Sequence, residues 1–109
     1  MKKVYKKLVR DKIPQIIKDN GKKPIYRVLD DVDYWRYLLK KDEEELIEVN
    51  NAATVSDRLE ELADKLEIIR AMAEFHGFTL QDVLNEADNK RNQKGGFEKR
   101  LLLEKVISK

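Results

Sequence analysis

The sequence predicts an all-α fold in a single domain that covers residues 1–109. Charged residues make up 40% of the chain, while glycine and proline are scarce, with four and two occurrences. This composition favours helices, because Gly and Pro are the residues that most often interrupt them. Long stretches also carry apolar residues at helical spacing behind capping residues. A chain of this length is sufficient for one hydrophobic core, although not a deep one.

The first quarter of the chain predicts one short helix and one short strand. Asp11 is expected to be the N-cap of a helix over residues 12–20. Pro14 is tolerated in the first turn of that helix, and Gly21 is a natural stop. Residues 25–29, with the sequence Ile-Tyr-Arg-Val-Leu, have the composition of a short strand.

Two long helices are predicted in the middle of the chain. Asp30 or Asp31 opens the first, which runs to about Asn50. Ser56 is expected to cap the second, which runs to the residue before Gly77. Both helices are long enough to carry several turns of apolar residues and can therefore build the core of the domain.

The last quarter predicts one further helix. Residues 79–82, Thr-Leu-Gln-Asp, have the pattern of a capping box that opens a helix to about Gln93. Gly95-Gly96 then breaks the chain. Residues 100–107 fit either a strand or a helical tail. If they form a strand, a minor two-stranded β element near the termini can accompany the helices.

The helix predicted over residues 56–76 carries apolar residues on two sides. One stripe consists of Leu59, Leu62, Ala63, Leu66 and Ala73, and the other of Ile68, Ala71, Met72 and Phe75. A helix that is apolar on two sides lies in the centre of a bundle or contacts a partner subunit. We therefore expect a helical bundle that is completed by oligomerisation, as a homodimer or a dimer of dimers.

Two pairs of carboxylates are the most informative motif of the chain. Glu45 and Glu48 are separated by twelve residues from Glu61 and Asp64, and each pair has i,i+3 spacing, which places both acids on one side of a helix. Each pair continues an apolar row of its helix, where an ionised acid is costly unless a cation neutralises it. Carboxylate oxygens suit Mg²⁺ or Mn²⁺. The alternative is an ordinary solvated acidic surface.

Charge is unevenly distributed, although the net charge is only +2. Residues 1–12 carry six Lys or Arg, residues 42–67 carry ten Asp or Glu, and residues 89–109 carry seven Lys or Arg. Such runs are explained either by solvated surfaces or by an acidic metal centre with basic arms for a polyphosphate. The small net charge does not indicate a nucleic-acid binder, so we do not expect nucleic acid as a partner.

Composition also limits the compartment and the chemistry. The chain has no cysteine, which excludes disulfides and zinc–thiolate sites and suits the reducing cytoplasm, where we expect the protein. No run of about 18 apolar residues is present, so no membrane association through a spanning helix is expected. The basic N-terminus lacks the long apolar stretch of a secretion signal.

The paired acids resemble the signature of the MazG-like, all-α nucleoside triphosphate pyrophosphohydrolases, which is ExxE, a spacer and ExxD. Residues 7–14, KLVRDKIP, and residues 90–97, KRNQKGGF, resemble a small single-domain branch related to phosphoribosyl-ATP pyrophosphohydrolase. Either half of the acidic motif alone occurs by chance in acidic helices. The paired motif with both flanking segments is fairly specific, and the resemblance spans nearly the whole chain.

The resemblance implies Mg²⁺-dependent cleavage of a nucleoside triphosphate to a nucleoside monophosphate and pyrophosphate, in the removal of non-standard or surplus nucleotides. The metal ligands it implies are Glu45, Glu48, Glu61 and Asp64. Either Glu45 or Glu48 is also a candidate to accept the proton of the attacking water. Lys90 and Lys94 match basic positions near the end of the last helix and are expected to offset charge on the leaving group. Solvated lysines are the alternative.

Further basic residues are weaker candidates for phosphate contacts, namely Lys7, Arg10 and Arg91. An ion pair with a nearby acid is an equal alternative for Arg10. Two other functions stay open at this point. One is phosphoribosyl-ATP pyrophosphohydrolase activity, and the other is a catalytically idle helical oligomer that binds a nucleotide or a protein partner.

Overall fold

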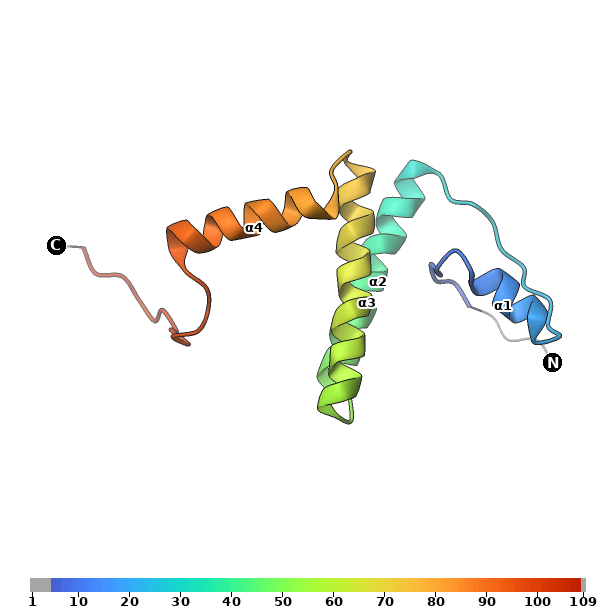
Figure 1. The fold of residues 1–109 in the computed structure, drawn as a ribbon, viewed down its shortest axis with the longest axis horizontal. Helices are drawn as coiled ribbons and strands as arrows, with labels where there is room; N and C mark the ends of the chain where they lie inside the picture. Colours follow the sequence, from blue (N-terminus) through green and yellow to red (C-terminus); the bar gives the residue numbers. More distant parts are fainter. Residues whose placement is uncertain (1–4, 109) are drawn as a thin grey trace.

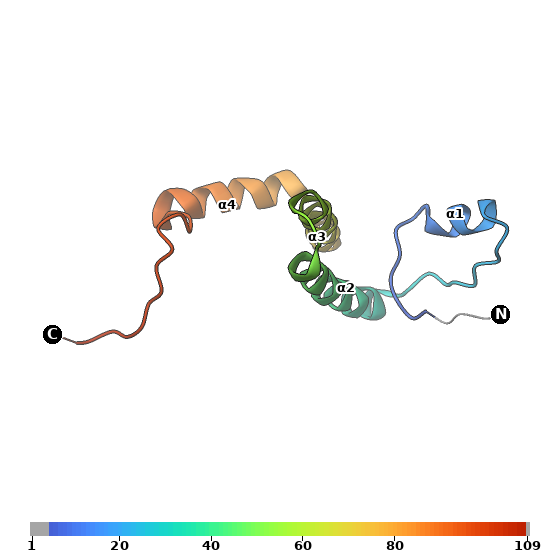
Figure 2. The same ribbon diagram turned by 90° about the horizontal axis from the view of Figure 1, so that it is seen from below.

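The computed structural model describes residues 5–108, and the regular secondary structure of these residues is entirely helical, which confirms the all-α prediction. The helices are α1 (Ile13–Asp19), α2 (Asp31–Asn51), α3 (Val55–Phe75) and α4 (Leu80–Lys94). Helices α2 and α3 form an antiparallel pair, and α1 and α4 lie on opposite sides of this pair (Figures 1 and 2). None of the four helices is long and apolar enough to cross a membrane.

Helices α2 and α3 form a hairpin that is joined by residues 52–54. The Thr54 hydroxyl accepts a hydrogen bond of 3.0 Å from a backbone amide in the first turn of α3. The expected cap, Ser56, is therefore wrong, because Thr54 offers the same capping chemistry two residues earlier and α3 begins there. Across the hairpin, Arg58 Nε donates to the Val49 carbonyl at 3.0 Å. This bond ties the start of α3 to the end of α2.

The core of the hairpin is small. Leu38 of α2 is 2% exposed, and Ile68 and Ala73 of α3 are each 7% exposed. Toward the start of α2, the Phe75 ring stacks on Trp35 with ring centroids 5.4 Å apart. Ile68 and Phe75 belong to the second apolar stripe predicted for this helix, so that stripe is the one that faces α2.

The other apolar stripe of α3 is mostly uncovered. Leu59, Leu62 and Leu66 are 68%, 49% and 42% exposed. The described residues expose 10324 Å², whereas a compact monomer of this mass exposes about 6300 Å². The radius of gyration is 18.6 Å, against about 13 Å for a compact chain of this length. One chain therefore leaves far more surface in water than a compact domain does.

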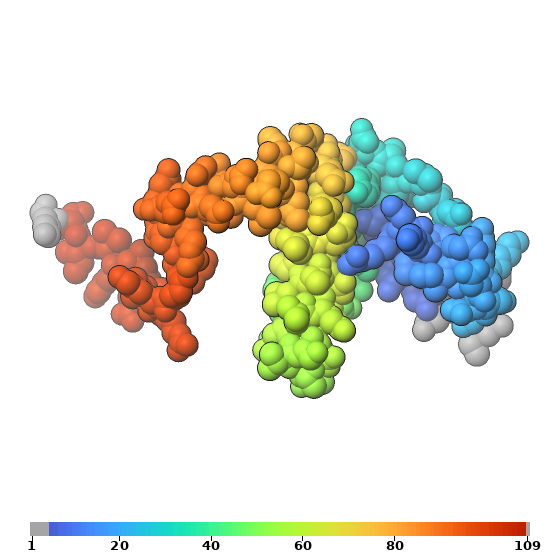
Figure 3. All heavy atoms as spheres, viewed as in Figure 1, coloured from blue at the N-terminus to red at the C-terminus, as the bar shows by residue number. Residues whose placement is uncertain are grey.

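Helix α4 begins with the predicted capping box. Thr79 Oγ1 accepts from the Asp82 amide at 3.1 Å, and an Asp82 carboxylate oxygen accepts from the Thr79 amide at 2.8 Å. Gly77, with φ of 83°, allows the turn between α3 and α4. Beyond this turn α4 leads away from the hairpin, and the segment after Gly95 leads further away (Figure 3). The helix therefore contributes little to the core.

Helix α1 is not capped by Asp11, contrary to the prediction. Its N-cap is Lys12, which makes no side-chain capping bond, although Pro14 lies in the first turn as expected. With Asp11 as the cap, the two amides available to it would be those of Ile13 and Pro14. The Ile13 amide donates instead to the Arg10 carbonyl at 3.0 Å, and Pro14 has no amide hydrogen. Helix α1 buries no residue and packs against none of the other helices.

The two segments with strand composition form no strand in the described part of the chain, so the minor β element is wrong there. Residues 25–29 are irregular, with Ile25 and Val28 89% and 92% exposed, and residues 100–107 are neither strand nor helix. The two segments lie at opposite ends of the molecule (Figure 1), so neither can supply the backbone partner that a strand requires. An isolated helix as short as residues 100–107 is also marginal in water.

Candidate metal centre

Three of the four predicted acids meet between α2 and α3. Glu45 of α2 and Glu61 and Asp64 of α3 each offer one carboxylate oxygen, and these three atoms lie within 4.8 Å of one another. Oxygens on opposite sides of an octahedral ion are about 4.2 Å apart around Mg²⁺, and about 5 Å apart around Ca²⁺. The spacing therefore suits a hard divalent cation without selecting one.

Glu48 adjoins this group of three. It is half-buried one turn after Glu45, and its negative charge acts on the neighbouring carboxyls. Hydrogen bonding between Glu61 and Glu48 is the main reason that the pKa of Glu61 is raised above its ordinary value. Four carboxyl groups therefore converge from two helices, and we call Glu45, Glu48, Glu61 and Asp64 the acid cluster.

Glu45 is the deepest member of the acid cluster, with 4% of its surface exposed, and it is the one buried charged residue among residues 5–108. Glu45 Oε2 is buried without a hydrogen-bond donor, and so is Glu61 Oε2. A buried carboxylate without a partner is costly and requires either a proton or a cation. These orphaned oxygens, in a donor set made of oxygen alone, fit a divalent metal ion.

The pKa of Glu45 follows from this environment. Burial raises it to about 7, with the charge of Glu48 as the next largest cause. Glu45 is therefore about half protonated at neutral pH when no cation is near. A nearby divalent charge acts in the opposite direction, because it favours the ionised carboxylate.

An ion pair beside the acid cluster connects the two helices. Lys65 Nζ of α3 lies 2.6 Å from Asp42 Oδ1 of α2, a pair that no local sequence pattern signals. Within α2, the Glu44 side chain is only 35% exposed and its Oε2 lies 3.5 Å from Lys41 Nζ. The i,i+3 spacing of Lys41 and Glu44 is a signal that could have revealed this contact.

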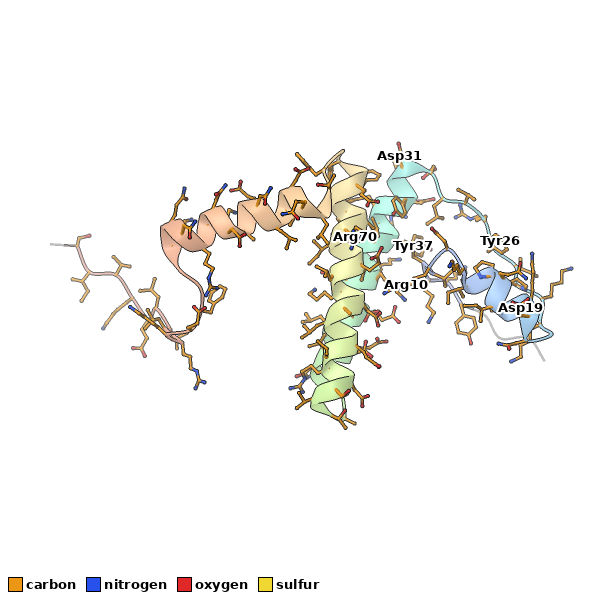
Figure 4. The ribbon with its side chains drawn as sticks, in the orientation of Figure 1. Arg10, Asp19, Tyr26, Asp31, Tyr37 and Arg70 are labelled. Carbon is orange, nitrogen blue, oxygen red and sulfur yellow. The ribbon has the colours of Figure 1, made fainter. Side chains whose placement is uncertain are left out.

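The basic N-terminal segment reaches both helices of the hairpin. Arg10 Nη2 lies 2.8 Å from Asp64 Oδ1, and Lys7 Nζ lies 4.0 Å from Glu44 Oε1. Figure 4 labels Arg10 on the N-terminal segment, between α1 and the hairpin. Of the two alternatives for Arg10, the structure has the ion pair with an acid. Contacts of Lys7 and Arg10 with phosphate stay a prediction.

The basic residues of α4 are not brought to the acid cluster within one chain. Lys90, Arg91 and Lys94 are all exposed on a helix that leads away from the hairpin (Figure 3). Arg91 pairs with Glu98 across the turn that follows α4. Lys90 and Lys94 can therefore act at an acid cluster only if α4 lies differently or if they reach the acid cluster of another copy.

Comparisons with known proteins assign no family. A curated protein from Mycolicibacterium smegmatis is 43% identical to the chain over 53 residues, and it is described as an uncharacterized protein. These residues make up 49% of this chain and 54% of that protein, so the chain spans about half the length of the relative it matches. No protein-family model and no solved structure matches the chain. The acid cluster is therefore the feature of this chain that indicates its function.

Proposed function

We propose that the protein is a Mg²⁺-dependent nucleoside triphosphate pyrophosphohydrolase of the MazG-like kind, which removes non-standard or surplus nucleotides. The observation that carries the proposal is Glu45, which is 4% exposed and has an unpartnered oxygen in a cluster with Glu61 and Asp64. Such a group weakens the fold of the metal-free chain. A carboxyl group whose pKa is raised this far, in contact with other acids, is typical of functional sites.

In this proposal the acid cluster holds Mg²⁺, with Mn²⁺ as a substitute. A bound ion of this type polarises a phosphoryl oxygen and lowers the pKa of water. The protein contributes the placement of the ligands, because each helix supplies two acids from successive turns. The stacked pair of Trp35 and Phe75 and the buried Leu38 hold the two helices together.

The residues of the acid cluster also account for the movement of the proton. The oxygen of the attacking water bonds to the α-phosphorus, and the bond from that phosphorus to the α–β bridging oxygen breaks. Pyrophosphate leaves with the bridging oxygen, and the water proton passes to a carboxylate. Glu45 or Glu48 takes this proton as the general base.

The basic half of the proposed site comes from a second copy, in a homodimer or a dimer of dimers. Lys90 and Lys94 are exposed on α4, and Leu59 and Leu62 are exposed on α3. The exposed surface of 10324 Å² exceeds the value for a compact monomer by about 4000 Å², an area in the range of obligate interfaces. Light scattering at micromolar concentration is expected to give a dimer or a tetramer, and a monomer would contradict this arrangement.

The proposed function is tested by the release of pyrophosphate from ordinary and damaged nucleoside triphosphates with Mg²⁺ or Mn²⁺. We expect release by the wild type and at least about a 100-fold loss in Glu61→Gln, comparable to the loss of a major electrostatic contribution. Glu60→Gln is the matched control, because Glu60 is exposed on the same helix and lies outside the acid cluster. Equal losses in both variants, or no release by the wild type from any nucleotide, would refute the assignment.

A further inference from the structure

The N-terminal segment, residues 5–12, is tethered to the acidic side of the hairpin by two ion pairs. Arg10 contacts Asp64 on α3, and Lys7 contacts Glu44 on α2, next to Glu45. Helix α1, which follows the segment, packs against none of the other helices. The side chains of Lys7 and Arg10 therefore hold the segment beside the acid cluster.

The Arg10–Asp64 pair is well formed but weak. Its N–O distance is 2.8 Å, while the Arg10 and Asp64 side chains are 58% and 44% exposed. Exposed ion pairs of this kind contribute at most about 1 kcal/mol, so Arg10 is released at little cost. Asp64 also belongs to the group of three acids whose oxygens lie within 4.8 Å. A divalent cation bound by these acids would therefore compete with the guanidinium for the same carboxylate.

We infer that Arg10 is a built-in counter-ion of the acid cluster, which a divalent cation displaces from Asp64 and which then binds the polyphosphate. The guanidinium is suited to both roles, because its planar set of donors matches a carboxylate and a phosphate equally well. The second role rests on the proposed function. The first requires only that the acid cluster binds a cation.

The first role is tested by titrating Mn²⁺ into the protein at low ionic strength in a calorimeter. Arg10→Gln is expected to bind Mn²⁺ about threefold or more tightly than the wild type, because a positive charge beside the ion is removed. Arg10→Lys keeps the charge and is expected to bind like the wild type. An unchanged or weaker affinity in Arg10→Gln would overturn the inference, because a purely structural Arg10 would weaken the site when removed.

The matched control is Lys12→Gln, which makes the same change of charge two residues away. Lys12 is exposed and takes part in none of the ion pairs of residues 5–108. The affinity of the Lys12→Gln variant for Mn²⁺ is expected to stay within about twofold of the wild-type value, because exposed charges at a distance are screened. A gain in Lys12→Gln equal to that in Arg10→Gln would overturn the role of the specific contact.

The second role is tested by titrating the Mn²⁺–tripolyphosphate complex into the same proteins. Arg10→Gln is expected to bind this complex about tenfold more weakly than the wild type, which corresponds to about 1.4 kcal/mol, and Lys12→Gln about equally. If the wild type binds neither Mn²⁺ nor the complex, the metal site and the proposed function fall together with the inference. If wild type and Arg10→Gln bind both probes equally, the Arg10 inference alone falls.

Discussion

A single chain assembles the acidic region of this protein, but it leaves the basic region of α4 apart from it. The acid cluster is assembled by a packed hairpin, with Glu45 4% exposed between α2 and α3. Lys90 and Lys94 instead are exposed on α4, a helix that leads away from the hairpin (Figure 3). The fold of one chain therefore brings the mutually repelling acids together. It does not bring the positive charges of α4 close enough to balance a polyphosphate bound at the acid cluster.

This difference separates what a single chain can do from what an assembly can do. A hairpin with an acid cluster is sufficient to bind a cation, and Arg10 on Asp64 supplies one positive charge from the same chain. Binding and cleavage of a highly charged substrate require more positive charge than that.

The largest effect is expected from the acid cluster. Asp64→Asn and Glu48→Gln should each lower the rate of pyrophosphate release by at least about 100-fold, because each removes a charge at the centre of the reaction. Helicity should be unchanged in circular dichroism, since both residues are only half-buried. Release at the wild-type rate from both variants would show that the acid cluster is not the site of reaction.

The second effect concerns the stability of the metal-free protein. The pKa of Glu45 is raised from 4.5 to about 7 by burial, so the folded state retains the proton over a range in which the unfolded state loses it. The free energy of unfolding is therefore expected to fall as pH rises from about 4.5 to about 7, by up to about 3 kcal/mol. Urea unfolding in a chelator measures this slope. Glu45→Gln removes the titrating group, so a slope as steep as that of the wild type would contradict the burial of an uncompensated acid.

A smaller effect is expected from the basic region. Replacing Lys90 and Lys94 together by alanine should lower activity by about tenfold, which is the usual effect of removing one charge-assisted hydrogen bond.

A mixing experiment tests whether a second copy supplies these lysines. The double alanine variant is co-expressed with Glu61→Gln, and each mixed dimer then has one intact site, with acids from the first chain and lysines from the second. Activity should then reach about a quarter of the wild-type value, against about a twentieth if each chain works alone. No recovery in the mixture would assign the lysines to their own chain or to no site.

The sequence was sufficient to predict the features that depend on local pattern. The capping box at Thr79 and Asp82 formed as expected, because its two hydrogen bonds lie within one turn. The acid pairs converged, because i,i+3 spacing fixes the side of the helix and a short link forces α2 and α3 to run side by side.

The features that depend on competition or on distant contacts could not be predicted. Thr54 and Ser56 offer the same capping oxygen, and the choice between them depends on where the hairpin turns. Arg10 and Asp64 are 54 residues apart, so their ion pair was only one of two alternatives. The strand predicted at residues 25–29 failed because composition does not reveal whether a partner strand is within reach.

The central claim, that the acid cluster is a site for a divalent cation, is tested most directly by calorimetric titration of Mg²⁺ at about pH 6.5, in two buffers of different ionisation enthalpy. Wild type and Glu60→Gln should bind Mg²⁺ and release protons, because Glu45 with a pKa of about 7 has to ionise when the cation binds. Glu45→Gln should bind at least about tenfold more weakly and release fewer protons. Binding that is absent in the wild type, or that is unchanged in Glu45→Gln, would contradict the claim.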